Sequence, residues 1–74
     1  MDEDLSKRHD ATQRMLKWFA YTHLPERLQR ISEPCHALAV EMIYALPDGA
    51  ELTAGLRKLL EAKDCFVRAG LEGS

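Results

Sequence analysis

The chain is poor in the residues that hold very small proteins together through covalent bonds or metal ions. Its 74 residues include two cysteines and three histidines. The two thiols, Cys35 and Cys65, can form at most one disulfide bond, and the scattered histidines show no zinc-ligand spacing. We therefore expect two reduced thiols that pack as small apolar residues, with no metal and no cofactor.

Catalytic motifs are also missing. The four glycines are scattered, so the sequence has no glycine-rich phosphate loop. No histidine stands in a motif with a cysteine or serine that it could activate as a nucleophile. We expect a protein that is not an enzyme and has no catalytic residues.

Long apolar runs and an excess of positive charge are absent as well. No apolar run approaches the ~20 residues that cross a bilayer. The segment from Met1 to Lys17 is charged throughout and does not resemble a signal peptide. The net charge of −2 argues against a general role in coating DNA. These features predict a cytoplasmic protein whose partners are neither membrane nor DNA.

The short length predicts self-association. A chain of this size buries only about 60% of the surface of its unfolded state. Small scaffolds usually need disulfides, a metal ion or oligomerisation. Because the first two are not expected here, oligomerisation is the expected source of additional stability.

Apolar spacing and prolines divide the chain into helices. Residues from Ala11 to Tyr21 have helical spacing over about three turns. The segment Thr22–Pro25 should end or bend this helix, because the residue before a proline disfavours the α conformation. Pro25 to Ile31 can start a second helix.

The middle of the chain permits two interpretations. Either Ser32 caps a new helix with Pro34 in its first turn, or Pro34 kinks one continuous helix. Residues Ala37 to Leu46 have strongly helical spacing in both cases. Pro47-Asp48-Gly49 predicts a turn in which the glycine accepts a positive φ.

A last helix should follow this turn, with Asp48 or Thr53 as its cap. No segment shows convincing strand alternation. The sequence predicts an all-α fold, with a variable, partly frayed N-terminal helix in residues 1–17 and an antiparallel helical hairpin in residues 18–72. The hairpin alone is too thin to enclose a core, so its apolar faces should be completed by homo-oligomerisation.

Two groups of side chains are candidates for binding. Trp18, Phe19 and Tyr21 are either core or interface anchors, or a platform on which a base stacks. Along the last helix, charged residues of both signs follow one another at spacings of four, three and four. They either form intrahelical ion pairs or present arginines to phosphate. The members of this row are Arg57, Glu61, Asp64 and Arg68.

Several short motifs together resemble a known family. They are Phe19-Ala20-Tyr21, His23, Pro25-Glu26-Arg27, Ile31, Ala37-Leu38-Ala39, Pro47 and Leu56-Arg57-Lys58-Leu59-Leu60-Glu61-Ala62. In this order they resemble the phage anti-CBASS and anti-Thoeris sponge family, small helical-hairpin proteins that sequester cyclic-nucleotide immune signals. The resemblance covers about Trp18 to Leu71.

The resemblance implies a homo-oligomer, from a dimer up to a hexamer built as a trimer of dimers. It implies pockets between chains that bind cyclic dinucleotides, cyclic trinucleotides or cyclic ADP-ribose variants without cleaving them, in the host bacterial cytoplasm. Tyr21 matches the base-stacking tyrosine. The ligand-binding residues implied in this chain are Phe19, Tyr21, His23, Arg27, Ser32, Arg57 and Arg68.

The chain departs from the family pattern at three positions. Thr22 separates Tyr21 from His23, which are adjacent in the family. Ser32 stands where cyclic-dinucleotide binders have a basic residue, so other arginines would have to neutralise the phosphates. Arg68 stands where the family usually has asparagine. The alternative hypothesis is a helical homo-oligomeric protein-interaction module that binds no nucleotide.

Overall fold

The computed structural model describes residues 7–73, which form three α-helices and contain no strand. The helices are α1 (Asp10–Lys17), α2 (Glu26–Ala45) and α3 (Ala50–Glu72). The prediction of an all-α fold is confirmed. Within the described part of the chain, no helix combines the length and the hydropathy needed to cross a membrane.

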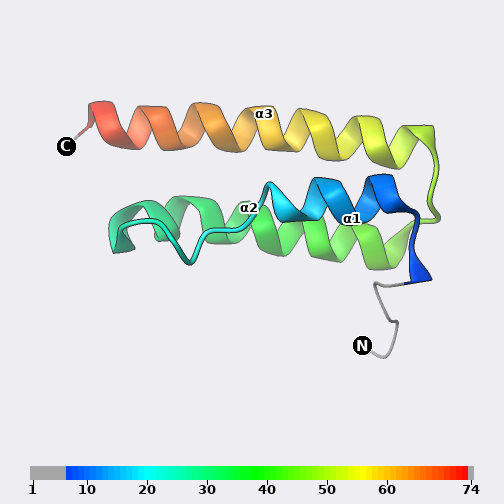
Figure 1. Ribbon diagram of the computed structural model, residues 1–74. Coiled ribbons are helices and arrows are strands. Elements are labelled where there is room, and N and C mark those ends of the chain that lie inside the picture. Colours follow the sequence, from blue (N-terminus) through cyan, green and yellow to red (C-terminus); the bar gives the residue numbers. More distant parts are fainter. Residues whose placement is uncertain (1–6, 74) are drawn as a thin grey trace.

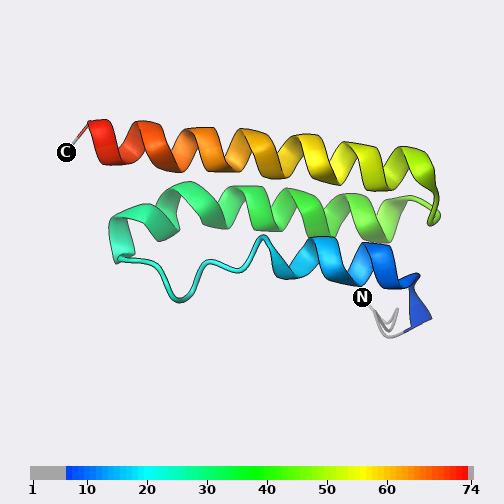
Figure 2. The same cartoon turned by 45° about the horizontal axis from the view of Figure 1, so that its top comes forward.

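The two long helices set the shape of the molecule. α2 and α3 lie side by side and run in opposite directions, joined by the short link 46–49 (Figure 1). The eight-residue α1 packs against both of them near that link. Residues 18–25 then cross to the start of α2 at the far end of the molecule (Figure 2). One short helix therefore covers one side of the α2–α3 pair.

The core lies where the three helices meet. On α2, Cys35, Ala39 and Ile43 recur every four residues and are buried. Fully burying a large apolar side chain contributes about 1.5–3 kcal/mol, so this core depends on a few large residues. The buried cluster is completed by Phe19, Leu52 and Leu56, with Met15, Leu16, Met42, Leu59 and Leu60 packed around it.

Helix α1 is shorter at its C-terminal end than the spacing predicted. It stops at Lys17, and the amides of Trp18 and Phe19 bond to the carbonyls three residues back. This tightened turn rotates Phe19 into the core, where its side chain has no exposed surface. Burial of Phe19 therefore outweighs continuation of the helix to Tyr21. Fraying was predicted from residue 1 to about Asp10; residues 1–6 lie outside the described residues, whereas Arg8 and His9 are hydrogen-bonded to the link 46–49.

Helix α2 is continuous through Pro34, which agrees with the second interpretation of that segment. A proline inside a helix removes one amide donor, which leaves the Arg30 carbonyl without its usual partner. Pro25 stands at the N-cap, and no side chain caps the helix. Instead, the side-chain Nε2 of Gln29 donates to the carbonyl of Leu24 at 2.8 Å and holds the entry to the helix.

The link between α2 and α3 differs from the predicted turn. Gly49 has φ 163° and ψ 176°, which is extended backbone open to any residue, so the expected positive-φ turn was wrong. Neither Asp48 nor Thr53 caps α3, whose N-cap is Gly49. The carboxylate of Asp48 faces α1 instead, accepting the Thr12 hydroxyl at 2.7 Å and the His9 amide at 2.9 Å.

Arg8 completes this polar contact, and we call Arg8, His9, Thr12 and Asp48 the Asp48 clamp. The Arg8 Nε lies 3.1 Å from the Asp48 carboxylate. The same guanidinium donates to the carbonyls of Ile43 and Leu46, at the end of α2. The hydrogen bond from the His9 amide, followed by those from Thr12 and Arg8, lowers the pKa of Asp48 from its usual 3.8.

Candidate functional site

A pocket with several basic side chains lies between the segment 17–24 and the C-terminal half of α3. Its volume is about 470 Å³, within the range of small-ligand sites. We call it the basic pocket. It is lined by Lys17, Trp18, Ala20, His23, Leu24, Lys63, Asp64, Val67 and Arg68.

Trp18 provides the aromatic surface of this pocket. Its side chain is 66% exposed, although the adjacent Phe19 is fully buried. The tightened turn that ends α1 separates the two rings, because it directs Phe19 inward and leaves Trp18 outside. An exposed indole can stack on a planar base, which is worth about 1–3 kcal/mol.

The charged groups of the basic pocket are predominantly positive. Lys17, Lys63 and Arg68 contribute three cations, against the single carboxylate of Asp64. The Nζ of Lys63 lies 3.1 Å from the Asp64 carboxylate, and the Lys63 side chain is only 13% exposed. Arg68 is exposed and directs one nitrogen to the Cys65 sulfur at 3.3 Å. A guanidinium is a planar fork of the kind that binds phosphate bidentately.

Of the seven ligand-binding residues that the resemblance implies, His23 and Arg68 line the basic pocket, and so do Trp18 and Asp64 from the two candidate groups. Tyr21 lies nearby in sequence but packs edge-on against His36, with ring centroids 5.3 Å apart. Phe19 is fully buried, so a ligand at the surface of this chain cannot stack on its ring.

The other predicted residues lie apart from this pocket. Arg27 donates to the Gly70 carbonyl at 3.2 Å and lines a separate, shallow depression at the start of α2. Arg57 is exposed on α3 and does not line the basic pocket. Ser32 is fully buried, so it cannot contact a ligand at the surface, and its hydroxyl has no hydrogen-bond partner among the described residues.

Sequence reasoning missed Lys17 and Lys63 as members of the site. Lys17 was placed only in the charged segment from Met1 to Lys17. A signal for both was available, because Lys17 directly precedes Trp18 and Lys63 stands five residues before Arg68. Only the return of residues 18–24 along α3 brings these separate positions to one pocket.

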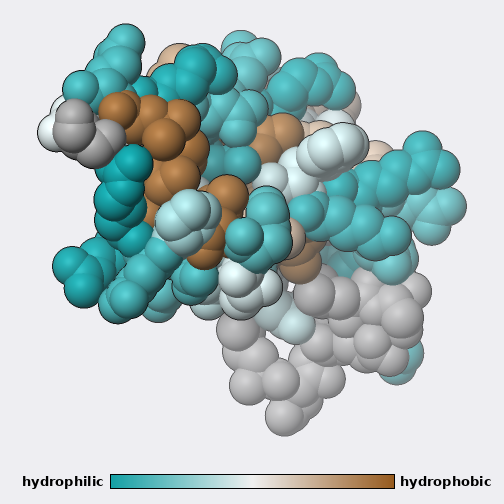
Figure 3. Space-filling view, turned by 60° about the vertical axis from the view of Figure 1, so that its left-hand side comes forward, coloured by the Kyte–Doolittle hydropathy of each residue, from teal (hydrophilic) through white to brown (hydrophobic). Residues whose placement is uncertain are grey.

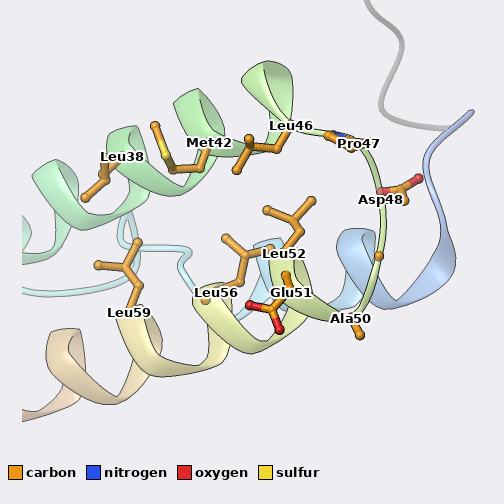
Figure 4. A pocket seen from close by; sticks show the side chains of 12 residues that line it. Leu38, Met42, Leu46, Pro47, Asp48, Ala50, Glu51, Leu52, Leu56 and Leu59 are labelled. Atoms are coloured by element: carbon orange, nitrogen blue, oxygen red, sulfur yellow. The ribbon is translucent and has the colours of Figure 1, made fainter.

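A second surface lies on the side of the α2–α3 pair near the link 46–49. Here an apolar groove of about 580 Å³ runs between the two helices (Figure 4). We call it the leucine groove. Its apolar walls are formed mainly by Leu38, Met42, Leu46, Leu52, Leu56 and Leu59.

Hydrophobic surface also reaches the opposite end of the molecule. Figure 3 views the end where α3 finishes and shows an apolar band between hydrophilic side chains. Phe66 and Leu71, on the last turns of α3, are 55% and 51% exposed. The described residues 7–73 contain no group of three or more histidine, cysteine or acidic side chains placed to hold a metal ion.

Comparisons with protein-family models, with curated proteins and with solved structures gave no match. The basic pocket combines a flat ring with cations, which suits an anionic, planar ligand. The leucine groove has the chemistry of a protein contact.

Proposed function

We propose that this chain is a non-catalytic binder of cyclic-nucleotide signals, an anti-defence sponge of a phage. The observation that carries this proposal is the exposed Trp18 ring beside the cations Lys17, Lys63 and Arg68. Cyclic dinucleotides, cyclic trinucleotides and cyclic ADP-ribose isomers all combine planar bases with phosphates. The family resemblance of the sequence points to the same ligands.

The residues of the basic pocket contact different parts of the proposed ligand. Trp18 stacks on a base, while Arg68 and Lys63 neutralise phosphate oxygens. His23 offers a hydrogen bond to the base or ribose. Tyr21, the base-stacking residue of the resembling family, steadies the segment 18–25 through its contact with His36.

Affinity requires more than one chain. A sponge that competes for scarce signal needs nanomolar binding, which is about 12 kcal/mol. One stacked base contributes about 1–3 kcal/mol, and each charged hydrogen bond contributes about 1.5–3 kcal/mol. Association itself costs about 4–15 kcal/mol. A single basic pocket therefore falls short, and we propose an antiparallel helical hairpin completed by homo-oligomerisation, in which neighbouring chains add contacts.

The test is calorimetry and thermal shift against a panel of cyclic dinucleotides, cyclic trinucleotides and cyclic ADP-ribose isomers. A ligand at about 100 times its Kd should stabilise the protein by about 2.7 kcal/mol. The ligand should be recovered intact. Trp18→Ala and Arg68→Ala should each weaken binding at least tenfold, the loss of about 1.4 kcal/mol. The matched control is Arg57→Ala, an exposed arginine on the same helix but outside the pocket.

A flat panel would contradict this proposal and favour the second candidate, a helical homo-oligomeric protein-interaction module that binds no nucleotide. The leucine groove is the observation in its favour, because a protein of this size gains by burying such a surface. This candidate predicts an oligomer that depends on concentration and a melting temperature that no nucleotide changes.

A further inference from the structure

Among the residues that line the basic pocket, Asp64 alone is acidic, and it stands beside the cations Lys17, Lys63 and Arg68. A carboxylate repels the phosphates that these cations attract. A ligand that covers the carboxylate must therefore offer it N–H or O–H donors. The pocket suits a ligand that carries phosphate and hydrogen-bond donors together.

The Asp64 carboxylate is held in place and is still open to a ligand. Its Oδ1 lies 3.1 Å from the Nζ of Lys63, whose side chain is only 13% exposed, whereas the Asp64 side chain is 47% exposed. An ammonium has three N–H donors, and the contact with Asp64 uses one of them. Lys63 and Asp64 therefore present donors and acceptors side by side at the wall of the pocket.

Helical spacing fixes where Asp64 lies relative to Arg68, which the proposed function assigns to phosphate. The two residues are four apart on α3, so their Cβ atoms lie about 5–6 Å from each other on one face of the helix. The segment 17–24 forms the other side of the pocket and contributes the exposed Trp18 ring. A nucleotide stacked on Trp18, with its phosphate at Arg68, can turn an edge of its base to Asp64.

Among the four common bases, guanine alone presents two adjacent N–H donors, at N1 and N2 of its Watson–Crick edge. A carboxylate accepts both, one on each oxygen. The O6 atom of guanine, the acceptor beside N1, then meets a remaining donor of the Lys63 ammonium. Adenine places an unprotonated N1 next to its amino group, so one oxygen of Asp64 would face a lone pair.

We infer that Asp64 selects guanine and that the ligands of the basic pocket are guanine nucleotides. Trp18 stacks on the guanine, Asp64 accepts hydrogen bonds from N1 and N2, and Arg68 binds the phosphate. This inference rests on the proposed function, since it takes nucleotide binding at the basic pocket as given. It narrows that function to cyclic nucleotides that contain guanine, and it excludes cyclic ADP-ribose isomers, whose base is adenine.

The experiment titrates the full chain with GMP, IMP and AMP, which share ribose and phosphate and differ in the base. The chain has one tryptophan, so the single indole N–H signal in a proton–nitrogen NMR spectrum reports on Trp18 in the basic pocket. GMP should bind about tenfold more tightly than AMP, or better, which is the discrimination of a good bidentate pair. IMP keeps N1–H and O6 but lacks the N2 amine, so its Kd should lie between the two.

The variant Asp64→Asn removes the carboxylate charge at nearly unchanged size. It should raise the Kd for GMP about tenfold and leave the Kd for AMP unchanged. The ratio of the two Kd values separates base selection from a structural role, because a distorted pocket would weaken both nucleotides alike. The matched control is Glu61→Gln, which removes an exposed carboxylate of α3 outside the pocket and should change neither Kd.

The outcomes separate this inference from the proposed function. Equal Kd values for GMP and AMP would overturn guanine selection and leave a nucleotide-binding pocket. Equal values that both rise in Asp64→Asn would place the carboxylate at the ribose hydroxyls, which overturns the inference as well. If none of the three nucleotides shifts the indole signal, guanine selection is wrong, and the panel of cyclic nucleotides decides the proposed function independently.

Discussion

The two sides of the α2–α3 pair carry similar apolar residues but differ in how much of each side chain is exposed. On the side that α1 covers, Ala39 and Ile43 of α2 have no exposed surface. In the leucine groove, Leu38 and Leu46 keep over two-fifths of theirs. Hydrophobicity alone does not separate these groups. The comparison teaches that two packed helices leave side chains exposed on a side that no third element covers.

The packing of α1 over the α2–α3 pair depends on polar contacts. Isolated helices shorter than ~12–15 residues are marginal in water, and α1 has eight residues. The Asp48 clamp ties its beginning to the link 46–49, and Phe19 inserts into the core after its end. The covered side is therefore held at both ends of α1, while no described residue from 7 to 73 packs over the leucine groove in this way.

The largest loss of stability should come from removing the buried ring of Phe19, which anchors α1 to the core. Phe19→Ala should destabilise the chain by about 3–5 kcal/mol, the cost of losing a large aromatic and leaving a cavity. The adjacent Trp18→Ala should cost far less, because Trp18 is 66% exposed. Urea unfolding of both variants measures the difference. Equal losses of unfolding free energy would show that the two rings are buried to the same extent.

Breaking the Asp48 clamp should have the next largest effect and should depend on pH. The folded-state pKa of Asp48 is lowered, so its contribution to stability is present above the usual value of 3.8 and is lost as pH falls through the folded pKa. Asp48→Asn should therefore lower stability near neutral pH, and the gap to wild type should narrow in acid. Urea melts from neutral pH down to acid check this.

The matched control for the clamp is Glu61→Gln, which removes an exposed carboxylate from α3 away from the link. It should leave the pH dependence of wild type unchanged. If the difference in stability between Asp48→Asn and wild type stays constant in acid, the charge of the Asp48 carboxylate contributes nothing to stability.

Alanine substitutions at two glycines of α3 compare an open position with a packed one. Gly55→Ala should stabilise the chain by up to about 1 kcal/mol, because alanine is the better helix former and the site is open. At Gly70 a new Cβ would lie 2.5 Å from the Ile31 side chain, so Gly70→Ala should gain less or destabilise. Thermal unfolding of both variants at one concentration ranks them. A larger gain at Gly70 would contradict the packing described.

The smallest effect is expected at Ser32, the buried hydroxyl without a partner among the described residues. Replacing it with alanine removes a polar group that gains nothing from burial, so Ser32→Ala should be neutral or stabilising, within about 1 kcal/mol. Thermal unfolding measures this. A clear loss of stability would mean that the hydroxyl is hydrogen-bonded in the folded protein.

The sequence predicted the helical class well and the contacts between helices poorly. The continuous spacing of Ala37 to Leu46 and the Pro47-Asp48-Gly49 link are local signals, and both appear where expected. The role of Asp48 was not predictable, because its partners stand 36 to 40 residues away. Local rules instead favoured Asp48 as a helix cap.

The candidate site shows the same limit. Aromatic and basic residues near His23 and along α3 marked the region, and His23 and Arg68 do line the basic pocket. Which ring faces outward was not predictable, since Trp18 and Phe19 are neighbours of similar chemistry. The tightened turn after Lys17 directs Phe19 inward and Trp18 outward. Burial of Phe19 in the core stabilises that turn.

The sequence by itself determined that the chain is helical, where its long helices break, and that its core would be small. These properties follow from residue spacing, from proline geometry and from chain length, which act locally or through composition. Only the tertiary structure decided which apolar residues are buried, that Asp48 holds α1, and that Lys17 and Lys63 join Arg68 in one pocket. Each of these depends on where a short helix packs, and packing is settled by contacts between distant parts of the chain.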